Sequence, residues 1–176
     1  MNCPIVIGLG SDHGDDQAGW LVVDDLHRRS FPNENLVWLN HPAGLLNAFN
    51  WDSEVKGQKV ILCDACMGTG TPGSVHRLKW TKEGLTPIFP EAGDPLADQK
   101  LVGTTCHPLS HRHSTSHDVS IFDLMELGVN LGWSPSLVEI WTVEGTVWNP
   151  GTDPSPSVVA AACRVADEIW KDIQDA

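Results

Sequence analysis

The sequence predicts an α/β protein in which a mostly parallel, twisted sheet carries helices on both faces. Strand-length apolar runs alternate with helical segments in the first half of the chain, a Gly-rich turn joins the first strand to the first helix, and a long amphipathic segment closes the chain. An alternating β-α-β-α-β order is typical of parallel sheets covered by helices.

The first βα unit is the most regular part of the pattern. Residues 5–9 form an uninterrupted apolar run rich in β-branched side chains, which predicts a strand buried on both faces. Gly8 and Gly10 indicate a tight turn after it. Asp15 and Asp16 then suit the start of a helix, because free amides and the helix dipole favour acids there.

Two further strands follow in the first half. Residues 36–39 predict the second strand and residues 43–49 a short helix. Residues 60–63 predict a third strand that ends on Asp64, in front of a loop rich in Gly and Thr. A strand–helix–strand order of this kind usually places the third strand beside the first.

The second half is less regular, because prolines interrupt the stretch 73–108. We expect a hairpin around residues 75–80 followed by loop. Asp118 can cap a helix that carries an apolar stripe. Residues 137–143 predict another strand, and after a turn at 150–156 an amphipathic helix closes the chain.

Composition limits the class of protein. With 176 residues and 41% hydrophobic side chains, the chain suits a single domain over residues 1–176. A net charge of −12, from 23 acids against 11 bases, argues against a nucleic-acid partner. The apolar runs are far shorter than the roughly 20 residues of a spanning helix, so we expect no membrane partner.

Cysteine usage and the N-terminus indicate a compartment. The five cysteines are an odd number and do not form a dense disulfide framework. The N-terminus runs directly into the first strand without a basic region or a cleavage site. We therefore expect a cytoplasmic protein.

Two acids follow strands that a parallel sheet brings together. Asp16 comes after the first strand and Asp64 ends the third, so both are expected at the crevice where ligand-binding groups gather. Acids held close together repel each other and favour a bound cation. His117, which precedes a helix, could add the imidazole that suits nickel or zinc.

Each of these residues also has a purely structural interpretation. An acid at a helix N-terminus is more often a cap than a ligand, and His117 could cap its own helix. Asp64 is harder to explain in this way, because a carboxylate directly after a buried strand is costly unless it is paired or functional.

Several familiar sites do not fit. The first turn reads G-x-G-x-x-x-G, acids occupy the place of a pyrophosphate, and the second strand ends at Leu39 and Asn40 without a ribose-binding acid, which argues against a dinucleotide site. The sequence contains no G-x-S-x-G and no H-E-x-x-H motif. No Ser-His-Asp order can be selected from spacing alone.

Two further groups could bind metal. Cys63 and Cys66 form a C-x-x-C, but the first lies in a predicted buried strand and no second pair exists, so we interpret both as structural cysteines. His107, His111 and His113 crowd the loop that ends at His117, which is an alternative metal cluster.

Three separated motifs resemble the hydrogenase maturation endopeptidases, over about two-thirds of the chain. Residues 7–11 (IGLGS) and 14–20 (GDDQAGW) are similar to the family's G-x-G-N and D-[DE]-x-x-G. Residues 64–65 (DA) and 70–78 (GTPGSVHRL) are similar to D-A and G-x-P-G-x-[VI]-x-R, and residues 114–118 (STSHD) to its S-x-H block.

The resemblance implies a three-layer, phosphorylase/hydrolase-like α/β sandwich with about five strands. It also implies an endopeptidase that removes the C-terminal extension from a nickel-iron hydrogenase large-subunit precursor, with nickel carried by that substrate as the recognition signal. Asp16, Asp64 and His117 would be the nickel-contacting and catalytic residues. Ser11 replaces the family's Asn and the spacer before Asp15 is short, so Asp15 and Asp16 both remain candidates for the first acid.

The resulting hypothesis is that these side chains complete the coordination of substrate-borne nickel and place the scissile bond, while a metal-polarised water or carbonyl supplies the reactivity. One rival is a nickel- or zinc-binding chaperone that uses the His-rich loop 107–117 and cuts nothing. A second rival is a nucleotide-binding α/β module.

Overall fold

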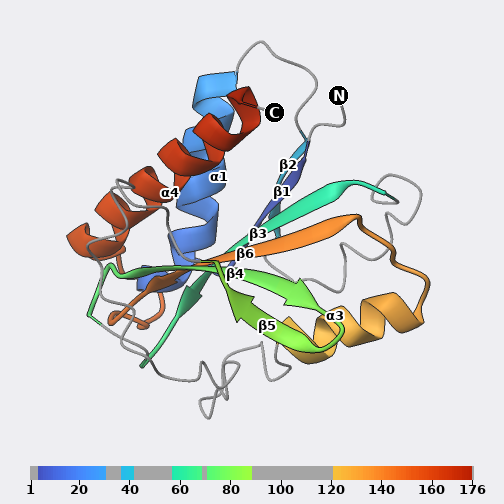
Figure 1. The fold of residues 1–176 in the computed structure, drawn as a ribbon. Coiled ribbons are helices and arrows are strands. Elements are labelled where there is room, and N and C mark those ends of the chain that lie inside the picture. The colour runs from blue at the N-terminus through green and yellow to red at the C-terminus, as the bar shows by residue number, and fades with distance from the viewer. Residues whose placement is uncertain (1–3, 31–36, 42–56, 69–70, 89–120, 176) are drawn as a thin grey trace.

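The computed structural model describes residues 4–30, 37–41, 57–68, 71–88 and 121–175. Six strands and three α-helices lie within these residues (Figure 1). In chain order the elements are β1 (Ile5–Leu9), the 3-10 helix η1 (Gly14–Gln17), α1 (Ala18–Ser30), β2 (Val37–His41), β3 (Lys59–Cys66), β4 (Val75–Thr81), β5 (Gly84–Pro87), α3 (Ile121–Asn130), β6 (Leu137–Glu144) and α4 (Pro156–Gln174).

The strands form one sheet in the order β2-β1-β3-β6-β4-β5. The first four are parallel to their neighbours, and β4 and β5 add an antiparallel hairpin at one edge. The predicted mostly parallel α/β sheet is therefore confirmed. It has six strands where about five were expected, because both arms of the hairpin around residues 75–80 join the same sheet.

Helices cover both faces of the sheet, as predicted (Figure 1). Val6, Ile61 and Trp141 point to the face on which α1 and α4 pack. Their neighbours along the strands point to the opposite face, where Met125 of α3 and Trp133 complete a second core. All five residues of β1 are buried, because this strand lies inside the sheet with a core on either side.

Two differences from the predicted element boundaries concern the candidate site. β3 runs to Cys66, so Asp64 lies within the strand and not at its end, because the pairing with β6 continues through these residues. The chain enters α1 through a turn of 3-10 helix that contains both candidate acids. The helix predicted at residues 43–49 and the cap predicted at Asp118 lie outside the described residues.

Two glycines let the start of α1 lie directly against the sheet. A Cβ on Gly19 would come within 2.2 Å of the Cys63 carbonyl oxygen and 2.3 Å of the Leu9 carbonyl oxygen. Gly10 has a φ of +141°, and a Cβ there would meet the Asp16 carbonyl oxygen at 1.9 Å. Only glycine permits both approaches. They fix η1 above the ends of β1 and β3.

A buried ion-pair network joins the sheet to α4. Glu139, which is 5% exposed, accepts hydrogen bonds from Arg77 at 2.8 and 3.1 Å and pairs with Lys59 at 2.7 Å. Burial alone would raise the pKa of Glu139, but these two cations outweigh it and lower the pKa. Arg77 also pairs with Asp172 of α4 at 2.5 Å and lies over the Trp141 ring at 4.7 Å. This arginine belongs to the resemblance motif, and its contacts are structural.

We expect Arg77→Met to lower the free energy of unfolding by about 2–3 kcal/mol, because methionine keeps the packing on Trp141 but leaves Glu139 with one cation fewer. Urea unfolding followed by tryptophan fluorescence measures the change. The matched control is Arg28→Met, whose exposed pair with Asp25 should contribute less than about 0.5 kcal/mol. Equal losses in the two variants would contradict this assignment.

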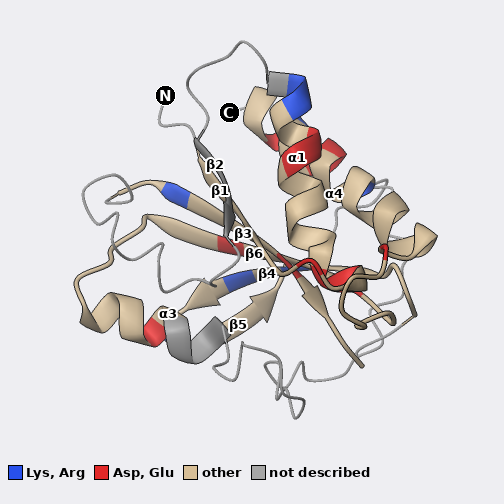
Figure 2. Cartoon of the chain, turned by 180° about the vertical axis from the view of Figure 1, so that it is seen from behind, with Lys and Arg blue, Asp and Glu red and all other residues tan. Residues whose placement is uncertain are grey.

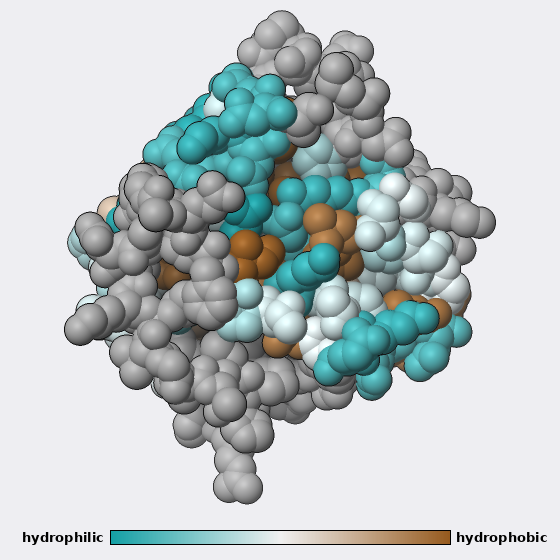
Figure 3. All heavy atoms as spheres, viewed as in Figure 1, coloured by the Kyte–Doolittle hydropathy of each residue, from teal (hydrophilic) through white to brown (hydrophobic). Residues whose placement is uncertain are grey.

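None of the described helices is both long and apolar enough to cross a membrane. In the face shown in Figure 3, the described hydrophobic residues form small patches among hydrophilic and neutral ones.

Candidate functional site

The topology brings the two predicted acids to the same end of the sheet. β1 and β3 are adjacent and parallel, with Gly8 opposite Cys63. The turn after β1 and the last residues of β3 therefore lie close together at the carboxyl ends of these two strands. Asp64 follows Cys63 in β3, and Asp16 lies in η1 just beyond β1. Acidic residues gather where the chain passes from β1 into α1 (Figure 2).

The two carboxylates interact electrostatically. Burial and, to a smaller extent, the negative charge of Asp16 raise the pKa of Asp64 from 3.8 to about 7, although a hydrogen bond from the Ala65 amide at 2.8 Å acts to lower it. Asp64 therefore gains or loses its proton near neutral pH. An acid with this proton affinity readily exchanges its proton for a metal ion.

Asp15 has a different role, because its carboxylate is buried and fully engaged by backbone amides. Oδ2 accepts hydrogen bonds from Thr146 and Val147 at 2.7 and 2.9 Å, and Oδ1 accepts one from Ser155 at 2.6 Å. Burial would raise the pKa of Asp15, but the three amides outweigh it and lower the pKa. Asp15 thus fastens η1 to the loop after β6.

Asp16 is the acid that interacts with Asp64. Its Oδ2 accepts a hydrogen bond from the Ser11 hydroxyl at 2.5 Å, and its charge acts on Asp64. The geometry therefore favours Asp16 over Asp15, the alternative that the sequence left open. Ser11, which departs from the resemblance motif, orients this acid.

The third predicted residue, His117, lies outside the described residues, as do His107, His111 and His113. The structure therefore brings together two of the three predicted site residues, and the complete set remains a prediction. The alternative histidine cluster is likewise a prediction.

The cysteines of the C-x-x-C lie on opposite faces of the sheet. Cys63 belongs to the core beneath α1 and α4, whereas Cys66, three residues later in the same strand, points to the other face. Both are free thiols. Burial, with a contribution from the Asp64 charge, raises the pKa of Cys63 strongly, so this thiol stays protonated and is a poor nucleophile. The structural interpretation of Cys63 is supported.

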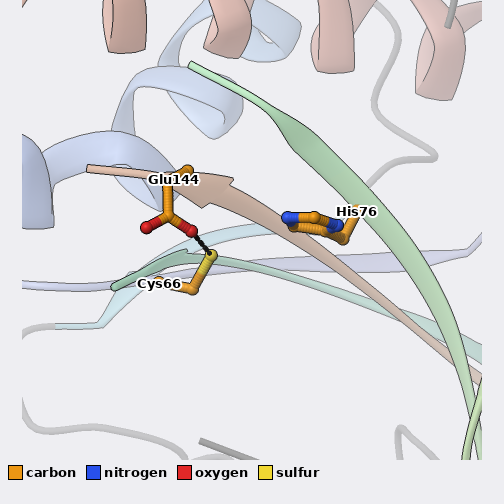
Figure 4. A group of neighbouring side chains, drawn as sticks. All are labelled: Cys66, His76 and Glu144. Atoms are coloured by element: carbon orange, nitrogen blue, oxygen red, sulfur yellow. Dashed lines mark hydrogen bonds between the residues drawn. The ribbon is translucent and has the colours of Figure 1, made fainter. Parts of the chain in front are cut away.

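Cys66 belongs to a group that the sequence did not predict. One ligand atom each from Cys66, His76 and Glu144 lie within 4.8 Å of one another. Figure 4 shows the three side chains turned toward each other from the ends of β3 and β6 and the start of β4. Burial lowers the pKa of His76, an effect that the Glu144 charge opposes. His76 is part of the motif at 70–78, but only the strand register reveals its neighbours.

The fold of this protein matches solved structures, whereas its sequence matches no known family. No protein-family model matches the chain, and no curated protein matches it. The solved hydrogenase maturating endopeptidase HybD from E. coli matches with a TM-score of 0.65 at 15% identity, over 98% of this chain and 93% of that one. The [NiFe] hydrogenase maturation protease HycI from Thermococcus kodakarensis has a TM-score of 0.63 at 19% identity, with coverages of 98% and 93%.

A hydrogenase 2 maturation peptidase from a Thaumarchaeota archaeon gives a TM-score of 0.58 at 21% identity, with 97% of each chain covered. All of these matches extend over nearly the whole chain, although the sequences have diverged widely. The protein therefore has the fold of the hydrogenase maturation proteases.

Proposed function

We propose that the protein is an endopeptidase that removes the C-terminal extension of a nickel-loaded nickel-iron hydrogenase large-subunit precursor. Nickel belongs to the substrate and marks the precursor as ready for cleavage. We place this activity in the cytoplasm, which agrees with the free thiols of Cys63, Cys66 and Cys163.

The observation that carries this proposal is the pair of interacting acids, Asp16 and Asp64, at the carboxyl ends of β1 and β3 in a fold shared with maturation proteases. Holding two carboxylates close together is unfavourable unless a proton or a cation separates their charges. Carboxylate oxygens and one imidazole form a ligand set that accepts a divalent ion of borderline softness such as nickel.

In this proposal Asp16, Asp64 and His117 contact the nickel of the bound precursor. The contact fixes the precursor tail in the crevice, so that the scissile peptide bond is held in one orientation. Asp15 takes no part in this contact, because backbone amides engage both of its oxygens. Its role is to hold η1, and with it Asp16, near the carboxyl ends of β1 and β3.

The test is cleavage of purified precursor. The protein should shorten nickel-loaded precursor and leave nickel-free precursor intact, as resolved by intact-protein mass spectrometry. Asp16→Ala, Asp64→Ala and His117→Ala should each lower the cleavage rate at least about 100-fold, because each removes a contact to the metal. Asp12→Ala is the matched control, since this neighbouring acid is 83% exposed.

The outcomes separate the hypotheses. Parent-like cleavage in all three variants would contradict the assignment of the site. Tight nickel binding by the parent without any cleavage of loaded precursor would instead support the metal-binding chaperone. A thermal shift with nucleotide and none with precursor would support the nucleotide-binding module.

A further inference from the structure

The group formed by Cys66, His76 and Glu144 is built by the register of three strands. Cys66 of β3 is the direct partner of Glu144 in β6, and His76 of β4 is the partner of Thr142, two residues earlier in β6. Side chains two residues apart in a strand share a face of the sheet. All three therefore point to the face that carries α3.

The contacts within the group are short. The Cys66 thiol donates a hydrogen bond to Oε2 of Glu144 at 3.4 Å, and the Gly68 amide donates to Oε1 of the same carboxylate. Cys66 is 1% exposed and Glu144 is 3% exposed, so both groups are withdrawn from water. The carboxylate is held in place by the backbone beyond β3, and the thiol is held against it.

The buried acids of this protein differ in what surrounds them. Glu139 is matched by the cations of Lys59 and Arg77, and Asp15 by three backbone amides. Glu144 accepts a hydrogen bond from the Gly68 amide and also lies beside a thiol and an imidazole. A thiolate, an imidazole and a carboxylate are together a ligand set for zinc and similar divalent ions.

The dimensions also suit one ion. Zinc bonds sulfur at about 2.3 Å and nitrogen or oxygen at about 2.0–2.2 Å, so its ligand atoms lie roughly 3.3–3.8 Å apart in a tetrahedral site. The three ligand atoms here lie within 4.8 Å of one another, and small side-chain rotations close the difference. Three protein ligands leave one tetrahedral position for water or a ligand.

We propose that Cys66, His76 and Glu144 form a second metal site, which binds one Zn²⁺ through thiolate, imidazole and carboxylate. On binding, the Cys66 thiol releases its proton to solvent, and bonds from sulfur and oxygen to the metal replace the hydrogen bond between Cys66 and Glu144. This site shares no residue with the set Asp16, Asp64 and His117. It does not depend on the proposed peptidase function.

The test is a metal titration of the full chain after removal of bound metal with a chelator. Co²⁺ serves as the spectroscopic probe, because cobalt bound to a thiolate gives a sulfur-to-metal charge-transfer band in the near ultraviolet. We expect this band to saturate at one ion per chain and to disappear when Zn²⁺ displaces the cobalt. Zn²⁺ should also raise the melting temperature of the metal-free protein.

Variants assign the ligands. Cys66→Ser should abolish the charge-transfer band, and His76→Gln and Glu144→Gln should each weaken metal binding by about 10-fold to 100-fold. Glu144→Gln keeps an oxygen for the Gly68 amide. The control Cys163→Ser removes an exposed thiol of α4 and should leave the band unchanged. Asp64→Asn should also leave band and stoichiometry unchanged, which separates this site from the nickel contact.

The absence of a charge-transfer band in the parent, or its persistence in Cys66→Ser, would overturn the proposal. Circular dichroism shows whether each variant folds. If Cys66→Ser does not fold, His76→Gln decides: parent-like cobalt affinity in that variant contradicts the site, whereas weakened affinity with an intact fold supports it.

Discussion

Replacing Asp15 with alanine is expected to lower the free energy of unfolding by about 3–5 kcal/mol, because it removes a fully buried carboxylate that accepts hydrogen bonds from three backbone amides. These amides belong to Thr146, Val147 and Ser155, so the variant also detaches η1 from the loop after β6. The change is a large fraction of the 5–15 kcal/mol that is typical of small domains. Urea unfolding followed by circular dichroism measures it.

Two controls separate the roles of the three neighbouring acids. Asp12→Ala removes an exposed acid and should change the free energy of unfolding by less than about 0.5 kcal/mol. Asp16→Ala should retain the fold and lose precursor cleavage. If Asp15→Ala keeps parent stability and Asp16→Ala unfolds the protein, the assignment of an anchor at Asp15 and a ligand at Asp16 is reversed.

The same interaction has a defined pH dependence. The pKa of Asp15 is lowered in the folded protein below its ordinary value of 3.8. Its contribution to stability is therefore present above about pH 3.8 and is lost as the pH falls through the folded-state pKa. The difference in stability between parent and Asp15→Ala should shrink over that acidic range.

Local patterns predicted much of the fold. The apolar run of β1 and the helical spacing of α1 each depend on residues that are close in sequence, and both elements were found where expected. The pairing of β1 with β3 followed from the general behaviour of strand–helix–strand units, and it placed Asp16 and Asp64 at the same end of the sheet. Chain connectivity alone was sufficient for this part of the candidate site.

Features that depend on register could not be predicted in this way. The two neighbouring acids Asp15 and Asp16 look alike in sequence, and only the loop after β6, about 130 residues later, distinguishes them. In the same way, the sequence favours a structural role for Cys66, because Cys63 lies in a predicted buried strand and no second C-x-x-C exists. Its neighbours His76 and Glu144 come from other strands, so only the strand register reveals them. A shift of one residue in either pairing would turn these side chains to opposite faces.

The carboxyl group of Asp64 is expected to titrate near pH 7 in the metal-free protein, since burial and the Asp16 charge both raise its pKa to about 7. Carbon-13 NMR of the aspartate carboxyl groups measures this midpoint. The variant Asp16→Asn removes the nearby charge and should lower the midpoint, while Asp12→Asn should leave it unchanged. A midpoint near the ordinary value of 3.8 in the parent would show that Asp64 is neither buried nor close to the Asp16 charge.

Because Asp64 titrates near neutral pH, precursor binding should strengthen with rising pH while the stability of the metal-free protein falls. A metal ion competes with the Asp64 proton, so the affinity for nickel-loaded precursor should rise about tenfold per pH unit below pH 7 and level off above it. The stability that the neutral acid contributes is fully present below pH 3.8 and is lost as the pH rises through about 7. Asp64→Asn stays neutral, so its stability relative to the parent should increase over that range while precursor cleavage is lost. This pH dependence is expected of a buried carboxylate that is unfavourable in its ionised form until a cation binds. A carboxylate that is already paired with a structural cation would have a lowered pKa and would not show it.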